Sequence, residues 1–402
     1  MKLLEQKKGR RLLLLGFISA ALIASSAACS NEPSQVASSS NQNGYDEQTP
    51  ILLHNETFFV GGSYNGAQYT GQSMIHRLSL GEQNTPIVML PGLGLSAYIY
   101  TSTPDGRAGW TSDFAAAGFD TYAVDTHNLA VSGLDAAAFG TENQPSLSVW
   151  GESKIWKTWG FGDNPNEPYP DTQYPVEYIE QLYASFSPQI SESKSSGVAG
   201  TETQSSVKDG GSVEQQPAGR RIGAPADVQA PEGAAKGGQR PAGTEQAEGA
   251  GQGGQSSRNA DPVEVQNMIA LLERTGPSVL MVHSMGGVTG FEVVRQRPEL
   301  VKALIVIEPV GSPTDKTDLE QHFVNVPYLA VYGDYIESRG QTGRYESCIE
   351  TAKVLNELGG YGEVMTLTDL GYKGNTHLMM QDRNKEEIAE HIIQWIQLHV
   401  KA

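Results

Sequence analysis

A serine, a histidine and an acidic residue occur in this chain in an order that suits nucleophilic chemistry. Ser284 follows the apolar run VLMVH, and the residues after it are Met285, Gly286 and Gly287. A serine in a tight turn between a strand and a helix, with small neighbours, projects its hydroxyl above the sheet. A hydroxyl is a weak nucleophile until a base takes its proton, so this chemistry also needs a histidine and a carboxylate that orients the histidine.

The serine turn by itself has two interpretations. The usual pattern is GxSxG, and here Val282 stands where the first glycine is expected. A serine in this position can also do no more than cap the following helix, a role that serine often takes. The rest of the site must therefore decide between a nucleophile and a cap.

His377 is the candidate base among the eight histidines. It lies in GYKGNTHLMMQDRN, a loop rich in Gly and Asn between the last predicted strand and the last predicted helix. The order serine, acid, histidine is the order that accompanies a serine turn of this kind. The alternative is a loop histidine without a catalytic task. We expect structural roles for the other histidines, which are His54, His76, His127, His283, His322, His391 and His399.

Two carboxylates are candidates for the acid. Glu308 lies in ALIVIEPVGSP, at the end of the strand after the serine helix, and Asp334 lies in YLAVYGDYI, one strand later. Asp334 directly follows Gly333, which leaves little chain to reach the histidine. Glutamate has an extra methylene, and Pro309 turns the chain off the sheet just after Glu308. We favour Glu308 and keep Asp334 as the alternative, and either residue can instead be a turn or surface acid.

The loop in IVMLPGLGLS, residues 87–96, follows a predicted strand and can supply backbone donors. Such donors stabilise the negative oxygen that forms when a carbonyl is attacked, and each contributes about 3 to 4 kcal/mol. We assign the two N–H groups to Leu93 and Met285, with Gly94 as the alternative to Leu93.

The same loop also matches the GxGxxA form of a dinucleotide-binding turn through Gly92, Gly94 and Ala97. That turn must open directly into a helix, but residues 104–106 are Pro, Asp and Gly, and the next predicted helix begins only near Trp110. We therefore expect no cofactor. No ligand spacing typical of zinc or calcium sites occurs, so we expect no metal.

Short apolar runs alternate with helical patterns along the chain, as in α/β proteins with a mostly parallel sheet buried on both faces. The predicted strands are residues 56–60, 86–90, 121–125, 278–282, 303–307, 328–332 and 363–367. The predicted helices are residues 111–117, 262–274, 286–295, 344–358 and 384–400. The last helix places Ile388, His391, Ile392, Trp395 and His399 on one face.

The chain divides into five predicted segments. Residues 191–261 contain no aromatic residue, Leu or Met, so they cannot build a core, and we expect a disordered insertion. Closing a loop costs only about 0.6 kcal/mol per doubling of its length, so one domain can carry it. The alternative is a linker between two domains. The five segments are residues 1–29 (signal peptide), 30–50 (flexible tether), 51–190 (N-terminal part of the domain with a cap), 191–261 (insertion) and 262–402 (C-terminal part).

The N-terminus predicts export. Basic residues precede the apolar run LLLLGFISAALIA, and residues 26–29, SAAC, resemble a bacterial lipobox whose cysteine carries lipid. We therefore expect lipidation of Cys29, which would anchor the protein to a membrane in the cell envelope. The alternatives are an ordinary secretory signal and a twin-arginine address. A lipidated Cys29 leaves Cys348 without a partner in the chain, so we expect no disulfide.

The charge of the chain argues against one class of partner. Acidic residues outnumber basic ones 46 to 28, giving a formal charge of −18. Nucleic-acid binding needs clustered Lys and Arg, so we expect a small-molecule substrate and no nucleic-acid partner.

The joint order of several motifs resembles bacterial α/β-hydrolase esterases that carry a TPDGRxGW segment, here Thr103 to Trp110. The resemblance covers about residues 59–384 without the insertion, through FVGGSYNG, PGLGLS, TPDGRAGWTSDF, VHSMGG, VIEP, VYGD and GNTHLMMQDRN. It implies the α/β-hydrolase fold with Ser284 as nucleophile, Glu308 as acid and His377 as base. Two departures are Pro91, where such enzymes have the His of an HG pair, and Val282.

The expected reaction is cleavage of a carboxylic ester through an acyl-enzyme. The alternatives are a lipase or acyltransferase on the same fold and a binding lipoprotein without turnover. The segment of residues 148–186 is rich in aromatic residues and is expected to form a cap over the site. Its side chains either line a substrate pocket or only pack the cap onto the sheet. These side chains are Trp150, Trp156, Trp159 and Phe161.

Overall fold

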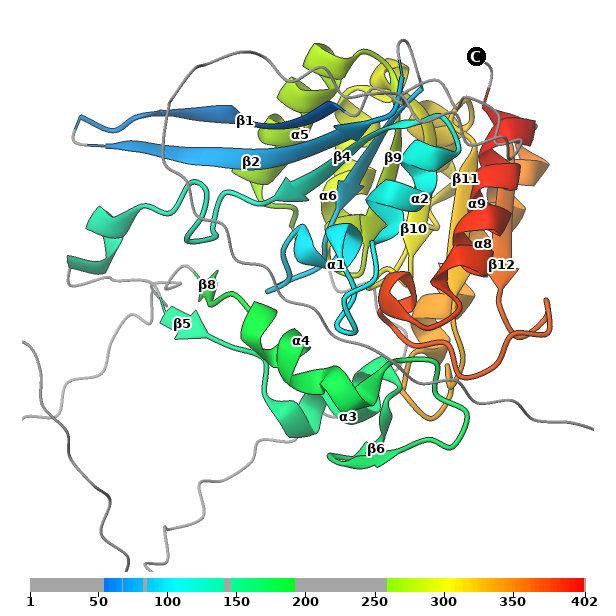
Figure 1. Cartoon of the computed structure of the whole chain (residues 1–402). Helices are drawn as coiled ribbons and strands as arrows, with labels where there is room; N and C mark the ends of the chain where they lie inside the picture. The colour runs from blue at the N-terminus through cyan, green and yellow to red at the C-terminus, as the bar shows by residue number, and fades with distance from the viewer. Residues whose placement is uncertain (1–53, 67, 82–84, 141–145, 192–258, 401–402) are drawn as a thin grey trace, which may run out of the picture. The chain divides into compact units, whose positions relative to one another are not determined.

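The computed structural model describes residues 54–66, 68–81, 85–140, 146–191 and 259–400 (Figure 1). The predicted signal peptide, the lipidation site at Cys29, the predicted tether and almost all of the predicted insertion lie outside the described residues. Within the described part, no helix is both long and apolar enough to cross a bilayer.

A mixed sheet of eight strands forms the centre of the fold, in the order β1-β2-β4-β3-β9-β10-β11-β12. Strands β1, β2 and β4 pair antiparallel, and all neighbours from β4 to β12 pair in parallel. The prediction of a mostly parallel sheet is confirmed. The strands are β1 (His54–Tyr64), β2 (Tyr69–Ser79), β3 (Pro86–Leu90), β4 (Asp120–Asp125), β9 (Ser278–His283), β10 (Val301–Ile307), β11 (Tyr328–Tyr332) and β12 (Gly362–Thr366).

Helices cover both faces of this sheet (Figure 1). Helices α5, α6 and α8 share one buried core with the sheet, and α2 and α9 share a second core on the other face. Because both faces are covered, β9 and β11 are buried along their whole length. The helices are α1 (Tyr98–Thr101), α2 (Trp110–Ala116), α3 (Glu152–Trp159), α4 (Ile179–Ser185), α5 (Pro262–Thr275), α6 (Gly286–Gln296), α7 (Lys316–Asp318), α8 (Thr342–Glu357) and α9 (Lys385–His399).

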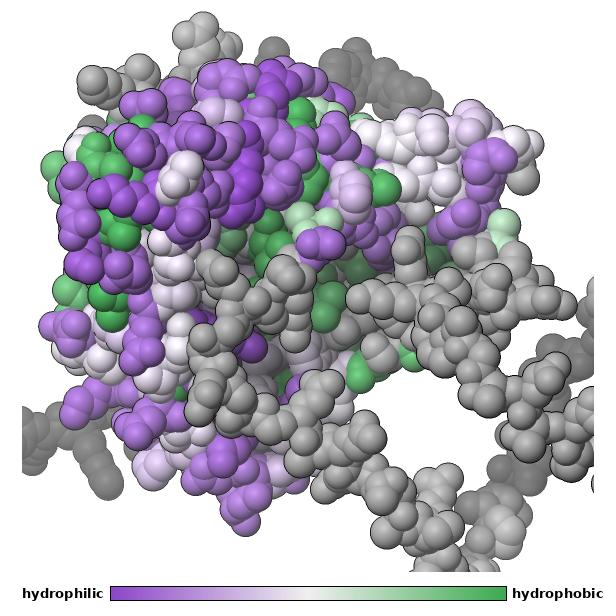
Figure 2. Space-filling view, turned by 180° about the vertical axis from the view of Figure 1, so that it is seen from behind, coloured by the Kyte–Doolittle hydropathy of each residue, from purple (hydrophilic) through white to green (hydrophobic). Residues whose placement is uncertain are grey.

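Hydrophilic side chains cover most of the described surface on the face seen in Figure 2.

The face of α9 that residue spacing predicts to be apolar is buried only in part. Ile388, Ile392 and Trp395 are buried, whereas His391 and His399 are only half-buried.

Strand β2 and helix α1 are among the elements that the prediction did not contain. Strand β2 was not expected, and of its residues only Ser73, Ile75 and Ser79 are buried. Two of these three are polar, so the strand lacks the apolar alternation that marks a half-buried strand. Helix α1 is a single turn that begins directly after Ala97, earlier than any helix in the prediction. It ends at Thr101, just before the Pro, Asp and Gly of residues 104–106.

The segment between β4 and the insertion forms a cap of short elements (Figure 1). It contains α3, α4 and two small two-stranded sheets, which are β5 (Ser146–Ser148) with β8 (Gln189–Ser191) and β6 (Gly162–Asn164) with β7 (Glu167–Pro168). Trp156, Trp159 and Phe161 are buried in the core that the cap shares with α2 and α9. Trp150 is half-buried, and its Nε1 donates a hydrogen bond of 2.7 Å to the carbonyl of Leu93.

Helix α6 packs closely on β9, which sets the position of the serine turn between them. A Cβ atom at Gly290 would lie 2.9 Å from Val282 Cγ1 and 3.1 Å from its Cγ2. Val282 therefore occupies the space that Gly290 leaves free. The first half of the GxSxG pattern lacks its glycine at Val282, and the glycine that allows close packing here is Gly290 on α6.

We expect Gly290→Val to lower the free energy of unfolding by about 1 to 3 kcal/mol, because the added side chain overpacks this contact. Urea denaturation of the two proteins measures the difference. Gly343→Val is the matched control, since Gly343 also lies in a helix but a Cβ there meets nothing within 4 Å. Equal stabilities for the two variants would contradict a packing role for Gly290.

Candidate active site

Ser284 occupies a strained turn between β9 and α6. Its φ is +52°, in the left-handed region that costs a non-glycine residue about 1 to 2 kcal/mol. The Ser284 N–H donates to the carbonyl of Ile307 at 3.0 Å, and the Ser284 carbonyl accepts from the N–H of Val310 at 3.3 Å. The end of β10 and the residues after it hold the serine in this conformation. Strain of this kind is typical of functional turns.

Glycines provide the space around this turn. A Cβ atom at Gly92 would lie 2.8 Å from Ser284 Cβ, and one at Gly286 would lie 2.8 Å from the carbonyl oxygen of Pro91. The loop after β3 and the first turn of α6 therefore lie against each other beside the serine. Pro91 contributes its carbonyl to this close contact.

Glu308 and His377 are joined by a buried hydrogen bond. His377 Nδ1 lies 2.7 Å from Glu308 Oε2. The same carboxylate accepts from the N–H of Gly333 at 2.9 Å, from Arg339 Nη1 at 3.0 Å and from Arg339 Nη2. Both carboxylate oxygens are thus paired. Because Nδ1 faces the carboxylate and carries the proton, Nε2 is the ring nitrogen that can take a proton.

The charges around this pair favour an ionised acid and a neutral base. Burial by itself raises the pKa of Glu308, but Arg339 and His377 outweigh burial and hold this pKa well below its usual range. Burial lowers the pKa of His377, and Glu308 opposes that change only in part. At neutral pH the imidazole is therefore neutral, as a general base must be.

The backbone of His377 is fixed from two sides. Its N–H donates to the carbonyl of Trp159 at 2.8 Å, and its carbonyl lies 2.9 Å from His283 Nε2. The rings of His283 and His377 lie 4.4 Å apart between centroids. Burial holds the pKa of His283 well below its usual range, so this ring is neutral and donates through Nε2–H.

The TPDGRAGW segment supports the loop that carries His377. Arg107 Nη2 donates to the carbonyl of Asp382 and Nη1 to that of Arg383, both at 3.1 Å. Trp110 Nε1 donates to the carbonyl of Lys385 at 3.0 Å. This segment therefore holds the chain just after the histidine loop, where α9 begins.

Asp382 in turn holds the histidine loop itself. It is fully buried and accepts hydrogen bonds of 2.8 Å from both the N–H and the hydroxyl of Thr376, and one of 3.0 Å from Asn375 Nδ2. The two residues that precede His377 are thus fixed to a single carboxylate. The position of the base follows from this network, because His377 is the next residue in the chain.

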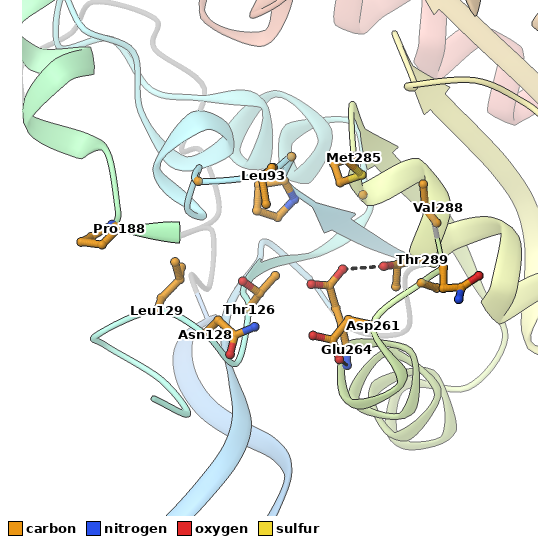
Figure 3. Close-up of a pocket in the computed structure, with 16 residues that line it drawn as sticks. Leu93, Thr126, Asn128, Leu129, Pro188, Asp261, Glu264, Met285, Val288 and Thr289 are labelled. Atoms are coloured by element: carbon orange, nitrogen blue, oxygen red, sulfur yellow. Dashed lines mark hydrogen bonds between the residues drawn. The ribbon is translucent and has the colours of Figure 1, made fainter. Parts of the chain in front are cut away.

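Leu93 and Met285, the residues predicted to provide backbone donors, border a cavity of about 290 Å³ (Figure 3). Among the described residues, neither of their N–H groups donates to a protein acceptor. Both are therefore available to an oxygen atom of a ligand. The cavity begins at the serine turn, through Gly92 and Met285, although Ser284 and His377 do not line it.

The far wall of the cavity is polar. The carboxylates of Asp261 and Glu264, at the start of α5, lie across the cavity from Leu93 (Figure 3). Glu264 Oε1 accepts a hydrogen bond of 2.6 Å from the hydroxyl of Thr289, and burial raises the pKa of Glu264. Asp261 caps α5 by accepting from the N–H of Val263 at 2.9 Å. No residue of the cavity comes from the chain between β10 and α9 that carries Glu308 and His377.

Neither Asp334, the alternative acid, nor Ser284, the predicted nucleophile, makes a hydrogen bond with His377 among the described residues. Asp334 acts as a turn residue, since its Oδ1 accepts from the N–H of Tyr335 at 2.6 Å and its Oδ2 accepts from that of Gly374 at 3.0 Å. The hydroxyl of Ser284 makes no hydrogen bond with His377 in the part of the chain that the structure describes. Such bonds are often long before substrate binds.

Sequence patterns did not identify every residue of the site. Arg339 belongs to no recognisable motif, yet it contacts Glu308. His283 was expected to have only a structural role beside the serine, yet it contacts His377. Among the residues described, no three His, Cys, Asp or Glu side chains are arranged to hold a metal ion.

This geometry can be compared with known proteins. No protein-family model matches the chain. A solved structure described as "a Novel Bacterial Esterase" is 23% identical, with a TM-score of 0.65, and the match covers 89% of this chain and all of that one. This chain has the α/β-hydrolase fold. It is also 22% identical to the "Probable secreted lipase phiG" of a fungal species, over 85% of this chain and 88% of that protein.

The contacts of the two candidate acids predict different mutant behaviour. We expect Glu308→Gln to lower kcat/KM for an ester by about 100-fold or more, because a neutral amide cannot stabilise the imidazolium. Asp334→Asn serves as the control and should stay within a few-fold of the unmodified protein. Steady-state kinetics of both variants measures the difference. The opposite ranking would show that Asp334 is the acid.

Proposed function

We propose that this protein is a serine hydrolase that cleaves carboxylic esters through an acyl-enzyme intermediate. The observation that carries the proposal is the 2.7 Å hydrogen bond between His377 and Glu308 in a chain whose Ser284 is held at a φ of +52°. Similarity to a bacterial esterase and a secreted lipase supports an ester as the substrate. The triad would consist of Ser284, Glu308 and His377.

The reaction would proceed in two acyl transfers. His377 Nε2 takes the proton of the Ser284 hydroxyl while Ser284 Oγ bonds to the ester carbonyl carbon. The protonated His377 then gives this proton to the leaving oxygen, the C–O bond breaks, and the alcohol departs. Water repeats the attack with His377 as base, which releases the acid and restores Ser284. Glu308 stays ionised throughout and stabilises the imidazolium.

The negative oxygen of each tetrahedral intermediate would lie between the N–H groups of Leu93 and Met285, with Gly94 as the alternative to Leu93. Each donor of this kind lowers the barrier by about 3 to 4 kcal/mol. The absence of protein acceptors for these two N–H groups in the described part of the chain supports this assignment.

The cavity beside the serine turn is proposed to bind the acyl group. The leaving oxygen must lie next to His377, which gives it a proton, whereas the cavity is lined by neither His377 nor its loop. The alcohol and acyl parts of the substrate would therefore point to different sides of Ser284. A volume of about 290 Å³ lies at the lower end of small-molecule pockets and favours a short acyl chain.

We expect the protein to hydrolyse 4-nitrophenyl acetate and butyrate faster than the laurate, because the cavity is small. Ser284→Ala is expected to lower kcat at least about 1000-fold. A fluorophosphonate probe should label the unmodified protein and the control Ser112→Ala, which changes a half-buried serine in α2. It should not label Ser284→Ala.

Other outcomes of the same panel separate the alternatives. Preference for long acyl chains would indicate a lipase, and transfer to an added alcohol in preference to water would indicate an acyltransferase. A protein that cleaves no ester and resists the probe would be a binding protein that keeps the fold without turnover.

We also propose that the protein is exported and carries lipid on Cys29. The apolar run after the basic residues, the sequence SAAC and the word "secreted" in the relative's name support export. In a bacterial host, a palmitate analogue should label the unmodified protein and Cys348→Ser, but not Cys29→Ser. Only these two cysteines exist, so the comparison is complete. An unlabelled but secreted protein would indicate an ordinary secretory signal.

A further inference from the structure

Arg339 is a buried cation that fixes the acid of the proposed triad. It lies in the loop after β11, and its side chain has no exposed surface. Nη1 donates to Glu308 Oε1 at 3.0 Å and to the carbonyl of Asp334 at 2.9 Å, and Nη2 donates to Glu308 Oε2. A guanidinium that binds both oxygens fixes the orientation of a carboxylate as well as its position. Oε2 therefore keeps the direction in which it meets His377.

Three consecutive residues at the end of α3, in the cap, lie against Arg339 or His377. The carbonyl of Thr158 accepts from Arg339 Nε at 3.2 Å, and that of Trp159 accepts from the N–H of His377 at 2.8 Å. A Cβ atom at Gly160 would lie 3.1 Å from Arg339 Cδ. The cap thus contacts the backbone of His377, the proposed base, directly. It is linked to Glu308, the proposed acid, through the side chain of Arg339.

We propose that Arg339 is a positioning residue that aligns Glu308 with His377 and makes this alignment depend on the seating of α3 in the cap. This inference rests on the proposed function, because it concerns the same acid–base pair. With α3 in this position, the carbonyl of Thr158 binds Arg339 Nε, so the guanidinium cannot rotate away from the carboxylate of Glu308. A cap displaced by an entering substrate would release that contact and the backbone contact to His377 together.

The charge of Arg339 also acts on the base. Glu308, Arg339 and Arg344 are the charged groups that influence His377, and His283 lies against its ring as a neutral group. Burial lowers the pKa of His377 and Glu308 raises it, while Arg339 and Arg344 lower it further. With Glu308 still ionised, removing the Arg339 charge is therefore expected to raise the pKa of His377. The neutral base would then form only at higher pH.

The first test substitutes Arg339 in the full chain. Arg339→Met is expected to lower kcat/KM for 4-nitrophenyl butyrate about 100-fold, because misalignment in a site of this kind has such an effect. It should also shift the acid limb of kcat/KM, and the His377 titration seen by NMR, upward by about one pH unit. In the unmodified protein both should lie below the ordinary histidine value of 6.5.

Two further variants separate charge from geometry and from folding. Arg339→Lys keeps the charge but not the forked donor, so it should lower kcat while it leaves the acid limb near its original pH. Arg295→Met is the control. Arg295 lies in the last turn of α6 and forms an ion pair with Asp318 in α7, so its removal should change neither kcat nor the pH of the acid limb. If Arg339→Met does not fold, Arg339→Lys and the glycine variants below decide the inference.

The second test addresses the cap. Gly160 and Gly359 both end helices, with φ of +83° and +84°, but a Cβ at Gly359 meets nothing within 4 Å. Alanine therefore introduces the same backbone strain at both positions, and only Gly160→Ala presses on Arg339. We expect Gly160→Ala to lower kcat/KM about 10-fold and Gly359→Ala to leave it unchanged. In the Arg339→Met background, Gly160→Ala should have a smaller effect, because coupled residues are not additive.

The outcomes distinguish this inference from the proposed function. Ester cleavage that disappears in Ser284→Ala establishes the function without reference to Arg339. An Arg339→Met protein with unchanged kcat/KM and an unchanged His377 titration would overturn the positioning role while the hydrolase assignment stands. Full additivity of Gly160→Ala and Arg339→Met would overturn the link to the cap. The NMR titration needs no turnover, so it tests the effect on His377 even in a protein that cleaves no ester.

Discussion

A buried carboxylate shared between a guanidinium and an imidazole is the interaction on which the rest of this site depends. Removing an ionised carboxylate from water costs several kcal/mol unless its oxygens are paired. Glu308 is 2% exposed, and its oxygens are paired by Arg339, His377 and the N–H of Gly333. The chain at the ends of β10 and β11 and the histidine loop must therefore come together for the fold to be stable. The proposed catalytic alignment and the stability of this edge of the sheet have the same cause.

The contacts that hold His377 and its loop come from separate parts of the described chain. Arg107 and Trp110 bind the chain after the histidine loop, Trp159 binds the His377 backbone from the cap, and His283 binds it from the end of β9. Three distant segments are thus used to place one imidazole. Proton transfer tolerates little displacement of the base, because the base must lie within hydrogen-bond reach of the proton.

Strands from both sides of the insertion belong to one sheet. β3, which lies before it, pairs in parallel with β9, which lies after it, from Ile87 with Val279 to Leu90 with Val282. The two parts of the described chain therefore share their cores, and the proposed oxyanion donors Leu93 and Met285 come from opposite sides of the insertion. A long connection is compatible with this arrangement, because the entropy of loop closure rises only slowly with length.

The sequence alone determined the α/β class, most strands and helices, the serine turn and the loop of the candidate base. These features depend on local patterns of apolar spacing and of glycine, which are visible in one segment at a time. Only the tertiary structure decided which acid meets His377, that Arg339 joins it, and that Gly290 makes room for Val282. Each of these facts is a contact between residues far apart in the chain or on different elements. Their side chains carry no local pattern that records the partner, so only the packing of strands and loops could bring them together.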